Sequence, residues 1–422
     1  MNNNMKVNNK NITDVITSAI FLIIIFFFAV LFFALPDKKH SDEENRSLQQ
    51  IPAFNSDTLI SGRFTDDIGK YYADQFPLRN IFVGMKTAVS YAFLINQNNG
   101  AVIAKDGYII QRHDLYDGIE ANFDLDLSFN ETMQYIKSNC EYINIFRENL
   151  KEFGNINLIF AVAPRKIDVM VNKLPAFFPA DRNQVYYNTL EENINHDIYH
   201  DLKSVLLSKN DEYIYYRTDH HWTTLGAYYA YCSLMEKLGV SKREPFYQEI
   251  YPIGKEHFLI EKVSSDFYGT TWSRAGAKWI KPDDIYYFRQ EDKLEAEIFM
   301  TEIHGRKIFE GFYDFELLQA KDKYASFTGG INARTSVYLK PDAEYYPNGR
   351  GKLLLVTDSF GQSIVPFLVW HYDLEIIDLR FFNGNIYDLI IDLKISDVLI
   401  LQGMESLSSQ NNLVKLLTKS GG

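Results

Sequence analysis

Cysteine is scarce in this sequence, since only Cys140 and Cys232 occur among 422 residues. Two cysteines cannot supply a thiolate-based zinc site, and no spacing typical of zinc ligands is present. Both fall in segments predicted to be helical, so we expect two buried thiols; the sequence does not require a disulfide. A glycine-rich phosphate loop is also missing, because the "GQSIV" after Ser359 lacks the lysine of a P-loop. We therefore expect no nucleotide site of that kind and no cofactor.

Basic residues are too few for a nucleic-acid partner. The chain has 43 Lys and Arg against 55 Asp and Glu, a net charge of −12. Phosphate backbones require a basic surface, so we expect no nucleic-acid binding. Charge alone also disfavours docking on anionic lipid. Aromatic residues are abundant at 15%, and core packing is the simplest use for most of them.

One long apolar run is present near the start of the chain. Residues 15–35, "VITSAIFLIIIFFFAVLFFAL", carry no charge and are long enough, as a helix, to cross a bilayer core of about 30 Å. No small-residue cleavage site follows, and Pro36 stands at the exit, which favours an uncleaved signal anchor. We expect a cytoplasmic tail at 1–14, a transmembrane anchor at 15–35, a linker at 36–60 and an extracytoplasmic body at the cell membrane.

The body alternates between helical and strand-like segments. A helix pair broken at Phe76-Pro77 and a hairpin at "AVIAKDGYIIQR" come first. The order after them predicts a doubly wound parallel α/β sheet, with 61–240 and 351–422 as its two parts and 241–350 as a β-rich insertion. The predicted segments are helix 130–153, strand 156–164, helix 185–208, strand 212–217, helix 223–238, strand 352–360, helix 361–372, strand 374–380, helix 384–394 and strand 397–403.

Ser359 is the first candidate for chemistry. In "KLLLVTDSFG" it ends an apolar strand and opens a helix, where free N–H groups and the helix dipole favour a developing oxyanion. A serine there can be a nucleophile if a base reaches it. It can equally be a helix N-cap.

Asp219 and His221 supply the base. In "YIYYRTDHHWTTLGA" they end the predicted strand 212–217, and the carboxyl ends of parallel strands share one rim. A spacing of two lets the carboxylate orient the imidazole as it takes the serine proton. The structural alternatives are an N-cap for Asp219 and a packed, hydrogen-bonded histidine for His221, with His220 pointing another way and Trp222 forming a wall.

A metal site is the other chemical alternative. His196 and His200 stand at i and i+4 of the predicted helix 185–208, and Asp219, His220 and His221 add donors. No glutamate stands between the histidines as in the metalloprotease pattern, so we predict no metal.

The combination of "TDHHWTTLGA" with "VTDSFG" resembles the DHHW family and its relatives, the alginate O-acetyltransferases and other SGNH-like polysaccharide acetyltransferases. Further resembling segments are "DEENRSLQQIPAF", "YYADQFPLRNIF", "VIAKDGYIIQR", "FAVAPRKIDVM" and "DLRFFNGNIYDL", which extend from about Asp42 to about Glu405. The resemblance implies an SGNH-type fold with Ser359 as nucleophile, His221 as base and Asp219 as its orienter. It also implies a multi-pass membrane O-acyltransferase that supplies the acyl group.

One departure from the SGNH pattern concerns order. SGNH hydrolases place serine first and Asp/His last, whereas here Asp219 and His221 precede Ser359, so the module resembles a circularly permuted form. "DVLILQGMES" is similar to the strand that carries the oxyanion asparagine, and Glu405 occupies that place. The oxyanion donors must then be the backbone N–H groups of Ser359 and Phe360, with Asn383 or Gly384 of "FFNG".

The resemblance and the residues together predict an extracytoplasmic O-acetyltransferase that acetylates a cell-surface polysaccharide or exopolysaccharide through an acyl-enzyme. Trp222, Arg380, Tyr268 and Trp272 are candidate substrate contacts, although Tyr268 and Trp272 can equally pack a lid. A carbohydrate acetyl-esterase with the same triad and a non-catalytic surface or sporulation-linked protein remain as alternatives.

Overall fold

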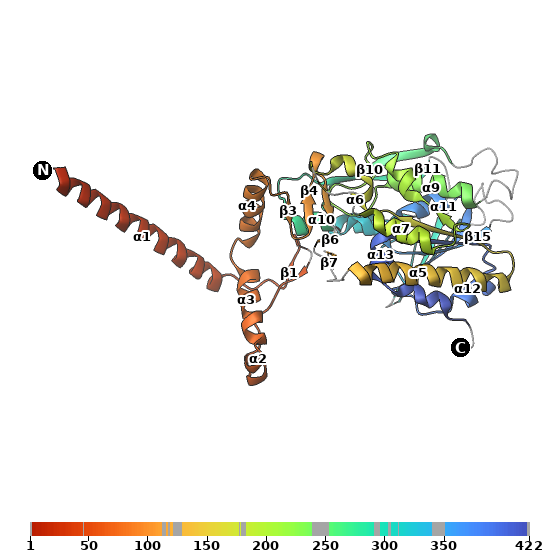
Figure 1. Ribbon diagram of the computed structural model, residues 1–422, viewed down its shortest axis with the longest axis horizontal. Coiled ribbons are helices and arrows are strands. Elements are labelled where there is room, and N and C mark those ends of the chain that lie inside the picture. The colour runs from red at the N-terminus through yellow and green to blue at the C-terminus, as the bar shows by residue number, and fades with distance from the viewer. Residues whose placement is uncertain are drawn as a thin grey trace. The chain divides into compact units, whose positions relative to one another are not determined.

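The computed structural model describes residues 2–44, 46–111, 115–116, 119–120, 129–176, 178, 183–238, 253–290, 296–302, 305–310, 312–339 and 351–419. The chain divides into two compact units, Met1–Ile95 and Asn96–Gly422 (Figure 1). This division does not coincide with the boundary predicted at residue 61.

The first unit begins with one long apolar helix. Residues Ile12–Ala34 of α1 are long and apolar enough, by length and composition, to cross a membrane. The helix pair interrupted at Phe76-Pro77 is confirmed by α3 and α4. Short elements occupy part of the predicted linker 36–60. The elements of this unit are α1 (Asn2–Ala34), β1 (His40–Ser41), β2 (Arg46–Ser47), α2 (Ser56–Ile60), α3 (Arg63–Gln75) and α4 (Arg79–Ala92).

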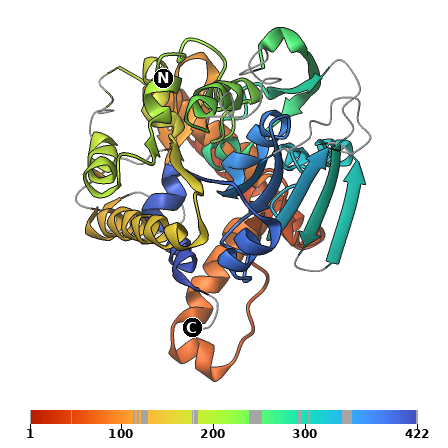
Figure 2. The same cartoon turned by 90° about the vertical axis from the view of Figure 1, so that its right-hand side faces the viewer.

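A mixed sheet of eight strands organises the second unit. Its order is β13-β12-β14-β16-β15-β17-β8-β9, and its strands lie side by side in Figure 2. The sheet consists of β8 (Asn157–Ala163), β9 (Tyr199–His200), β12 (Ala296–Glu302), β13 (Gly305–Glu310), β14 (Arg334–Leu339), β15 (Gly351–Thr357), β16 (Tyr372–Ile377) and β17 (Asp397–Gly403). The strands from β16 to β9 pair in parallel, whereas β13, β12 and β14 are antiparallel. The sheet predicted to be parallel is therefore mixed: its parallel strands are as expected, but three strands of the predicted insertion add an antiparallel edge.

Buried side chains alternate between the two faces of the parallel strands, which explains their unbroken apolar sequences. Leu353, Leu355 and Leu399 belong to one apolar cluster, and Leu354 and Ile400 belong to the other. Helix α9 (Thr224–Leu238) packs into the first cluster. Helices α5 (Phe129–Leu150), α7 (Gln184–Asn193) and α12 (Ile386–Leu393) pack into the second. The sheet is thus covered on both faces, and its carboxyl edge is left for the loops.

The predicted helices are confirmed at α5, α9 and α12 and wrong in two other places. The expected helix 185–208 is broken, because Tyr199 and His200 leave it to pair with β8 and Asp201 caps the separate helix α8 (Leu202–Leu207). The expected helix 361–372 is a 3₁₀ turn, Ser359–Ile364, followed by α11 (Val365–Leu368). Both cysteines are free; Cys140 is buried and Cys232 is half-buried.

The predicted strand 212–217 does not exist. Tyr215 forms an isolated bridge with Trp222, and the residues around them form an irregular loop. Side chains from distant segments bond its backbone groups, so its polar atoms are satisfied without a strand partner. Asp219 and His221 consequently reach the carboxyl edge of the sheet from a loop.

The segment predicted as a β-rich insertion, 241–350, does contain strands, but three of them extend the main sheet. β10 (Phe258–Phe267) and β11 (Asp283–Gln290) form a separate antiparallel pair, and α10 (Thr270–Ala275) lies between them in sequence. Parts of the segment lie outside the described residues.

The hairpin predicted at 101–112 is confirmed by β4 (Ala101–Ile103) and β5 (Ile109–Gln111). The remaining elements are β3 (Gln97–Asn98), β6 (Leu115–Tyr116), β7 (Ile119–Glu120), α6 (Lys166–Val169) and α13 (Met404–Ser409).

Candidate active site

The turn that carries Ser359 is fixed by the preceding residue. Strand β15 ends at Thr357, and Asp358 caps the 3₁₀ turn by accepting the Phe360 N–H at 3.0 Å. The second carboxylate oxygen of Asp358 accepts the Gly403 N–H at 2.8 Å and the Ser406 hydroxyl at 2.6 Å. Asp358 thereby ties the end of β15 to the end of β17, and the position of Ser359 follows from the sheet.

The loop that carries Asp219 and His221 is held by two buried ionisable residues. One oxygen of Asp283 accepts the Arg217 N–H at 2.9 Å, and the other accepts the Thr218 N–H at 2.7 Å and the Thr218 hydroxyl at 2.6 Å. Lys166, the first residue of α6 shortly after β8, donates to the carbonyls of Tyr216, Arg217 and Asp219. Asp283 thus binds two N–H groups and Lys166 three carbonyls of a loop that has no strand partner.

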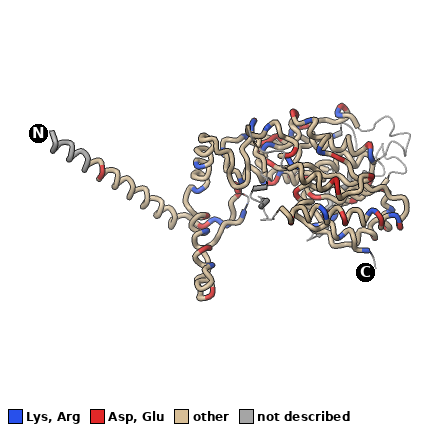
Figure 3. The backbone as a smooth tube through the Cα atoms, viewed as in Figure 1, with Lys and Arg blue, Asp and Glu red and all other residues tan. Residues whose placement is uncertain are grey.

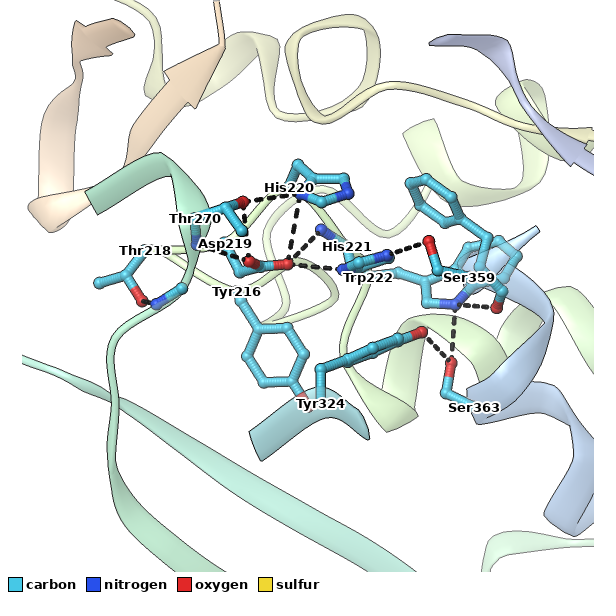
Figure 4. A network of polar contacts seen from close by, with 12 residues as sticks. Tyr216, Thr218, Asp219, His220, His221, Trp222, Thr270, Tyr324, Ser359 and Ser363 are labelled. Atoms are coloured by element: carbon cyan, nitrogen blue, oxygen red, sulfur yellow. Dashed lines mark hydrogen bonds and ion pairs between the residues drawn. The ribbon is translucent and has the colours of Figure 1, made fainter. Parts of the chain in front are cut away.

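Asp219, His221 and Ser359 form a continuous hydrogen-bonded chain (Figure 4). The Nδ1 atom of His221 lies 2.6 Å from Oδ1 of Asp219, and Nε2 lies 2.7 Å from Oγ of Ser359. The other oxygen of Asp219 accepts the Thr270 N–H at 2.9 Å. These distances are those of a nucleophile, a base and an orienting carboxylate. The structure therefore brings together the three residues that the sequence suggested for the triad.

Aromatic rings cover both faces of the His221 imidazole. Tyr324 stacks on it with ring centroids 4.0 Å apart and an interplanar angle of 6°, and the Tyr324 hydroxyl lies 3.0 Å from Ser363 Oγ. The ring of His220 lies 3.9 Å from that of His221, and its Nδ1 lies 3.6 Å from Asp219 Oδ1. His220 thus faces the same carboxylate, which corrects the expectation that it points away.

The electrostatics favour an ionised Asp219. Burial acts to raise the pKa of Asp219, but the positive potential of His220 and His221 and the His221 hydrogen bonds hold it well below its usual range. Burial lowers the pKa of His220, and His221 lowers it further. Burial also lowers the pKa of Lys166 to about 8. A carboxylate of this kind can stabilise the imidazolium that forms when His221 accepts a proton.

Two of the predicted oxyanion or substrate residues are engaged in the protein itself. The Phe360 N–H already bonds Asp358, and the buried Trp222 donates its Nε1–H to the Phe360 carbonyl at 3.1 Å and to Ser363 Oγ at 2.8 Å. Trp222 therefore fastens the histidine loop to the serine turn. The backbone N–H of Ser359 makes no hydrogen bond to any residue that the structure describes, so it is the donor still available.

The remaining predicted contact residues lie farther from the hydrogen-bonded residues Asp219, His221 and Ser359. Asn383 and Gly384 are exposed, and neither makes a hydrogen bond to the triad within the described part of the chain. Arg380 is paired with Asp378 and lines a small cavity with Ser406, the residue that bonds Asp358. Trp272 is buried in a small apolar cluster where it packs on Tyr268, with ring centroids 4.3 Å apart. That placement favours the packing role for Trp272.

The spacing argument for a metal site is wrong for His196 and His200, because no helix spans them. His200 lies in β9, and its Nε2 is 2.6 Å from Ser233 Oγ. Asp219, His220 and His221 do bring donor atoms within 4.8 Å of one another. Two of those residues, Asp219 and His221, already form the hydrogen-bonded chain to Ser359.

Sequence reasoning missed four residues that shape this site: Lys166, Thr270, Asp283 and Tyr324. The three polar ones act on the loop backbone or on the Asp219 carboxylate, and Tyr324 acts through its ring. All lie far from Asp219 in sequence. Only Lys166 carried a signal, since it follows the apolar strand β8 at the carboxyl edge of the sheet, where functional groups gather.

Comparison with known proteins gives two kinds of similarity. The curated protein named probable alginate O-acetylase AlgJ of Pseudomonas fluorescens is 27% identical over 188 residues, which is 43% of this chain and 45% of that protein. The protein of the same name from Pseudomonas aeruginosa is 24% identical over 204 residues, 47% of this chain and 48% of that protein. The matches thus span about half the length of these relatives.

Solved structures share the fold over more of the chain. A DHHW family protein from Eubacterium siraeum has a TM-score of 0.56 at 23% identity and covers 76% of this chain and 98% of that one. PatB1 of Bacillus cereus with a sulfonyl adduct has a TM-score of 0.57 at 17% identity and covers 75% and 99%. A family model described as DHHW protein matches residues 140–377, more than half of the chain. The chain therefore belongs to the DHHW protein family.

Proposed function

We propose that this protein is a membrane-anchored, extracytoplasmic O-acetyltransferase that acetylates hydroxyl groups of a cell-surface polysaccharide or exopolysaccharide. The observation that carries the proposal is the hydrogen-bonded chain from Asp219 through His221 to Ser359 at the end of β15. The partial matches to proteins named alginate O-acetylase support acetyl transfer to a polysaccharide. Under the proposal the second unit is an SGNH-like module whose motifs are circularly permuted.

The first half-reaction acylates Ser359. Its Oγ attacks the carbonyl carbon of an acetyl ester donor while His221 Nε2 accepts the hydroxyl proton, and Asp219 stabilises the resulting imidazolium. The tetrahedral intermediate then collapses, the bond from carbon to the donor oxygen breaks, and His221 returns the proton to that oxygen. The products are the donor alcohol and acetyl-Ser359.

The second half-reaction repeats these steps with a sugar hydroxyl. His221 removes the hydroxyl proton, the sugar oxygen attacks the acetyl carbon, and Ser359 leaves with the proton that His221 returns. Water attacks in the same way if it reaches the site, so transfer requires that the acceptor exclude it. The Ser359 N–H is the proposed oxyanion donor in both halves, because the Phe360 N–H is occupied by Asp358.

The proposal assigns the acyl supply to a partner. Helix α1 would anchor the chain with the catalytic unit outside the cytoplasm, and a multi-pass membrane O-acyltransferase would deliver acetyl groups from within. The resemblance to the polysaccharide acetyltransferases motivates this arrangement. The apolar span Ile12–Ala34 supports the anchor.

The experiment that tests the function uses the full chain in lipid nanodiscs with a small acetyl ester as donor. Acetyl on a panel of oligosaccharides and free acetate are measured by mass spectrometry, with Ser359→Ala as the matched control. We expect acetylated sugar from the wild type and none above background from Ser359→Ala. Serine-dependent acetate release that no sugar diverts would identify an esterase, and identical behaviour of the two proteins would point to a non-catalytic role.

A further inference from the structure

Helix α4 of the first unit carries its large apolar side chains on the outside. Ile81, Met85 and Val89 of α4 and Phe93, the residue that caps it, are each four residues from the next and are 56%, 58%, 56% and 76% exposed. The buried positions of α4 are instead Gly84 and Thr87. A helix of a water-soluble domain shows the opposite pattern, with its apolar stripe turned inward.

The contacts of α1 with α3 and α4 locate this stripe relative to the apolar span. Phe28 of α1 stacks on Phe76 with ring centroids 5.4 Å apart and meets Phe82, in the first turn of α4, at 5.6 Å. One turn later, Phe32 meets Tyr72 at 5.4 Å. The start of α4 is therefore beside the last turns of the helix expected to cross the bilayer.

The depth of that contact follows from helix geometry. The apolar span of 23 residues is about 34 Å long, slightly more than a hydrocarbon core of about 30 Å. Phe28 lies six residues before the end of α1 at Ala34, which is about 9 Å along the axis. Helices that lie in a membrane interface bury their apolar faces about 5–10 Å below the headgroups.

Charge and chemistry agree with a lipid partner. Figure 3 shows no charged residue along α1 after Asp14. Helix α4 contains Arg79 and Lys86 but no acidic residue of its own; Arg79 is paired with Glu44, and Lys86 adds a positive charge that anionic headgroups favour. Tyr71 and Tyr72, beside Phe32, are the residue type enriched where the headgroups begin.

We infer that α4 is an interfacial helix, with Ile81, Met85, Val89 and Phe93 inserted into the lipid surface from which α1 emerges. The inference rests on the membrane anchor of the proposed function but requires no catalysis. A helix in the interface beside the anchor restricts the first unit to the membrane surface. The linked catalytic unit is then kept close to the membrane, where an acyl donor delivered across the bilayer would arrive.

Site-directed spin labelling of the full chain tests the inference. The chain is reconstituted in vesicles of phosphatidylcholine and phosphatidylglycerol, with nitroxides introduced by Met85→Cys, Val89→Cys, Asp67→Cys or Ile23→Cys. The native Cys140 thiol can stay, because it is fully buried and burial raises its pKa to about 12. Cys232→Ser removes the half-buried thiol from every variant. The Cys232→Ser protein without an introduced cysteine measures background labelling.

We expect labels at 85 and 89 to collide with oxygen and to be shielded from a water-soluble nickel chelate, as lipid-exposed labels are. The label at 67, on the polar face of α3, should show the reverse. Access of the nickel chelate to 85 and 89 equal to that at 67 would overturn the inference. Shielding of 85 and 89 from both reagents would also overturn it, because that result indicates a protein partner.

The label at Ile23 separates this inference from the proposed function. A lipid-exposed label at 23 with water-exposed labels at 85 and 89 rejects the interfacial helix and leaves the anchor intact. A water-exposed label at 23 rejects the anchor and the interfacial helix together. Loss of acetyl transfer in the nanodisc experiment, with lipid-exposed labels at all three positions, rejects only the catalytic proposal.

Discussion

Ser359 and His221 lie at one site but are held there by two different kinds of structure. Ser359 follows β15, a strand with parallel neighbours on both sides, and its turn is capped by Asp358. His221 stands in an irregular loop whose backbone is satisfied by Lys166 and Asp283. Ser359 is thus positioned by many shared hydrogen bonds, whereas the position of His221 depends on a few buried polar side chains. We therefore expect substitutions that disturb the His221 loop to lower activity more than stability. Substitutions that disturb β15 and the Ser359 turn should lower stability more than activity.

Among substitutions in the His221 loop, Asp219→Asn should have the largest effect on the rate of acetyl transfer. The amide can still bond His221, but it favours the wrong tautomer and cannot stabilise the imidazolium. We expect acetyl transfer to fall by about 10³–10⁴-fold, with little change in the thermal midpoint. The rate is measured with an acetyl ester and the midpoint by circular dichroism. A loss smaller than about tenfold would mean that the loop does not supply the base.

Lys166→Met tests whether the loop carbonyls need their buried donor. Three carbonyls lose a hydrogen bond, so we expect acetyl transfer to fall by about 10–100-fold as His221 shifts from Ser359. Lys173→Met is the matched control, because Lys173 pairs with the exposed carboxylate of Asp106. Equal activity of the two variants would show that the loop holds its shape without Lys166.

The same lysine predicts a pH dependence of stability. Its pKa is lowered by burial to about 8 from an ordinary 10.5, so between these values the unfolded chain binds more protons than the folded one. The free energy of unfolding of wild type relative to Lys166→Met should therefore rise with pH, by about 2 kcal/mol between about pH 7.5 and 9.5. Urea titrations at the two pH values measure it, and an unchanged difference would contradict the buried charge.

Two glycines offer a direct comparison of the His221 loop with the Ser359 turn. A Cβ at Gly269 would lie 2.2 Å from Asp219 Cβ, and one at Gly361 would lie 2.3 Å from Thr357 Oγ1 in β15. Each Gly→Ala change should cost about 1–3 kcal/mol of stability. We expect only Gly269→Ala to lower the turnover number of the folded enzyme, by about tenfold, because it displaces Asp219. A larger turnover defect in Gly361→Ala would reverse the comparison.

His220→Gln should give the smallest effect. The Nδ1 atom of His220 lies 3.0 Å from Thr270 Oγ1 and 3.6 Å from Asp219 Oδ1, but no described contact links His220 to Ser359. Its charged form lowers the pKa of Asp219, so we expect a two- to five-fold loss of turnover, consistent with the weak coupling of partly exposed charges. A loss comparable to that of Asp219→Asn would make His220 a second base.

The sequence predicted the regular parts of this arrangement and singled out three residues, Asp219, His221 and Ser359, that the structure joins by hydrogen bonds. Strands β8, β15 and β17 were predicted because their apolar runs reflect burial on both faces, and Ser359 was found because it ends one of them. The aromatic run 213–216 also resembles a strand, but the backbone at its end is bonded by side chains 50 or more residues away. Lys166 donates to the Tyr216 carbonyl, and Asp283 accepts the Arg217 N–H. Local pattern does not encode such long-range side-chain bonds, and for the same reason Tyr324 was not found.

The antiparallel edge of the sheet was missed for a related reason. Strands β12, β13 and β14 have the composition of a separate β-rich region, and the sequence contains nothing that specifies the pairing of β14 with β16. Register between distant strands is set when they pack together. The sequence therefore predicted that strands occur there but not which sheet they join.

The most direct test of the account is whether His221, held by its loop, activates Ser359. The full chain is mixed with p-nitrophenyl acetate without acceptor, quenched at short times, digested and mapped by mass spectrometry for wild type, His221→Ala and Ser359→Ala. The account predicts acetyl on Ser359 of the wild type, at least about 10³-fold slower acetylation in His221→Ala, and none at that peptide in Ser359→Ala. Acetylation of Ser359 at the same rate without His221, or acetylation of the wild type at another residue only, would contradict it.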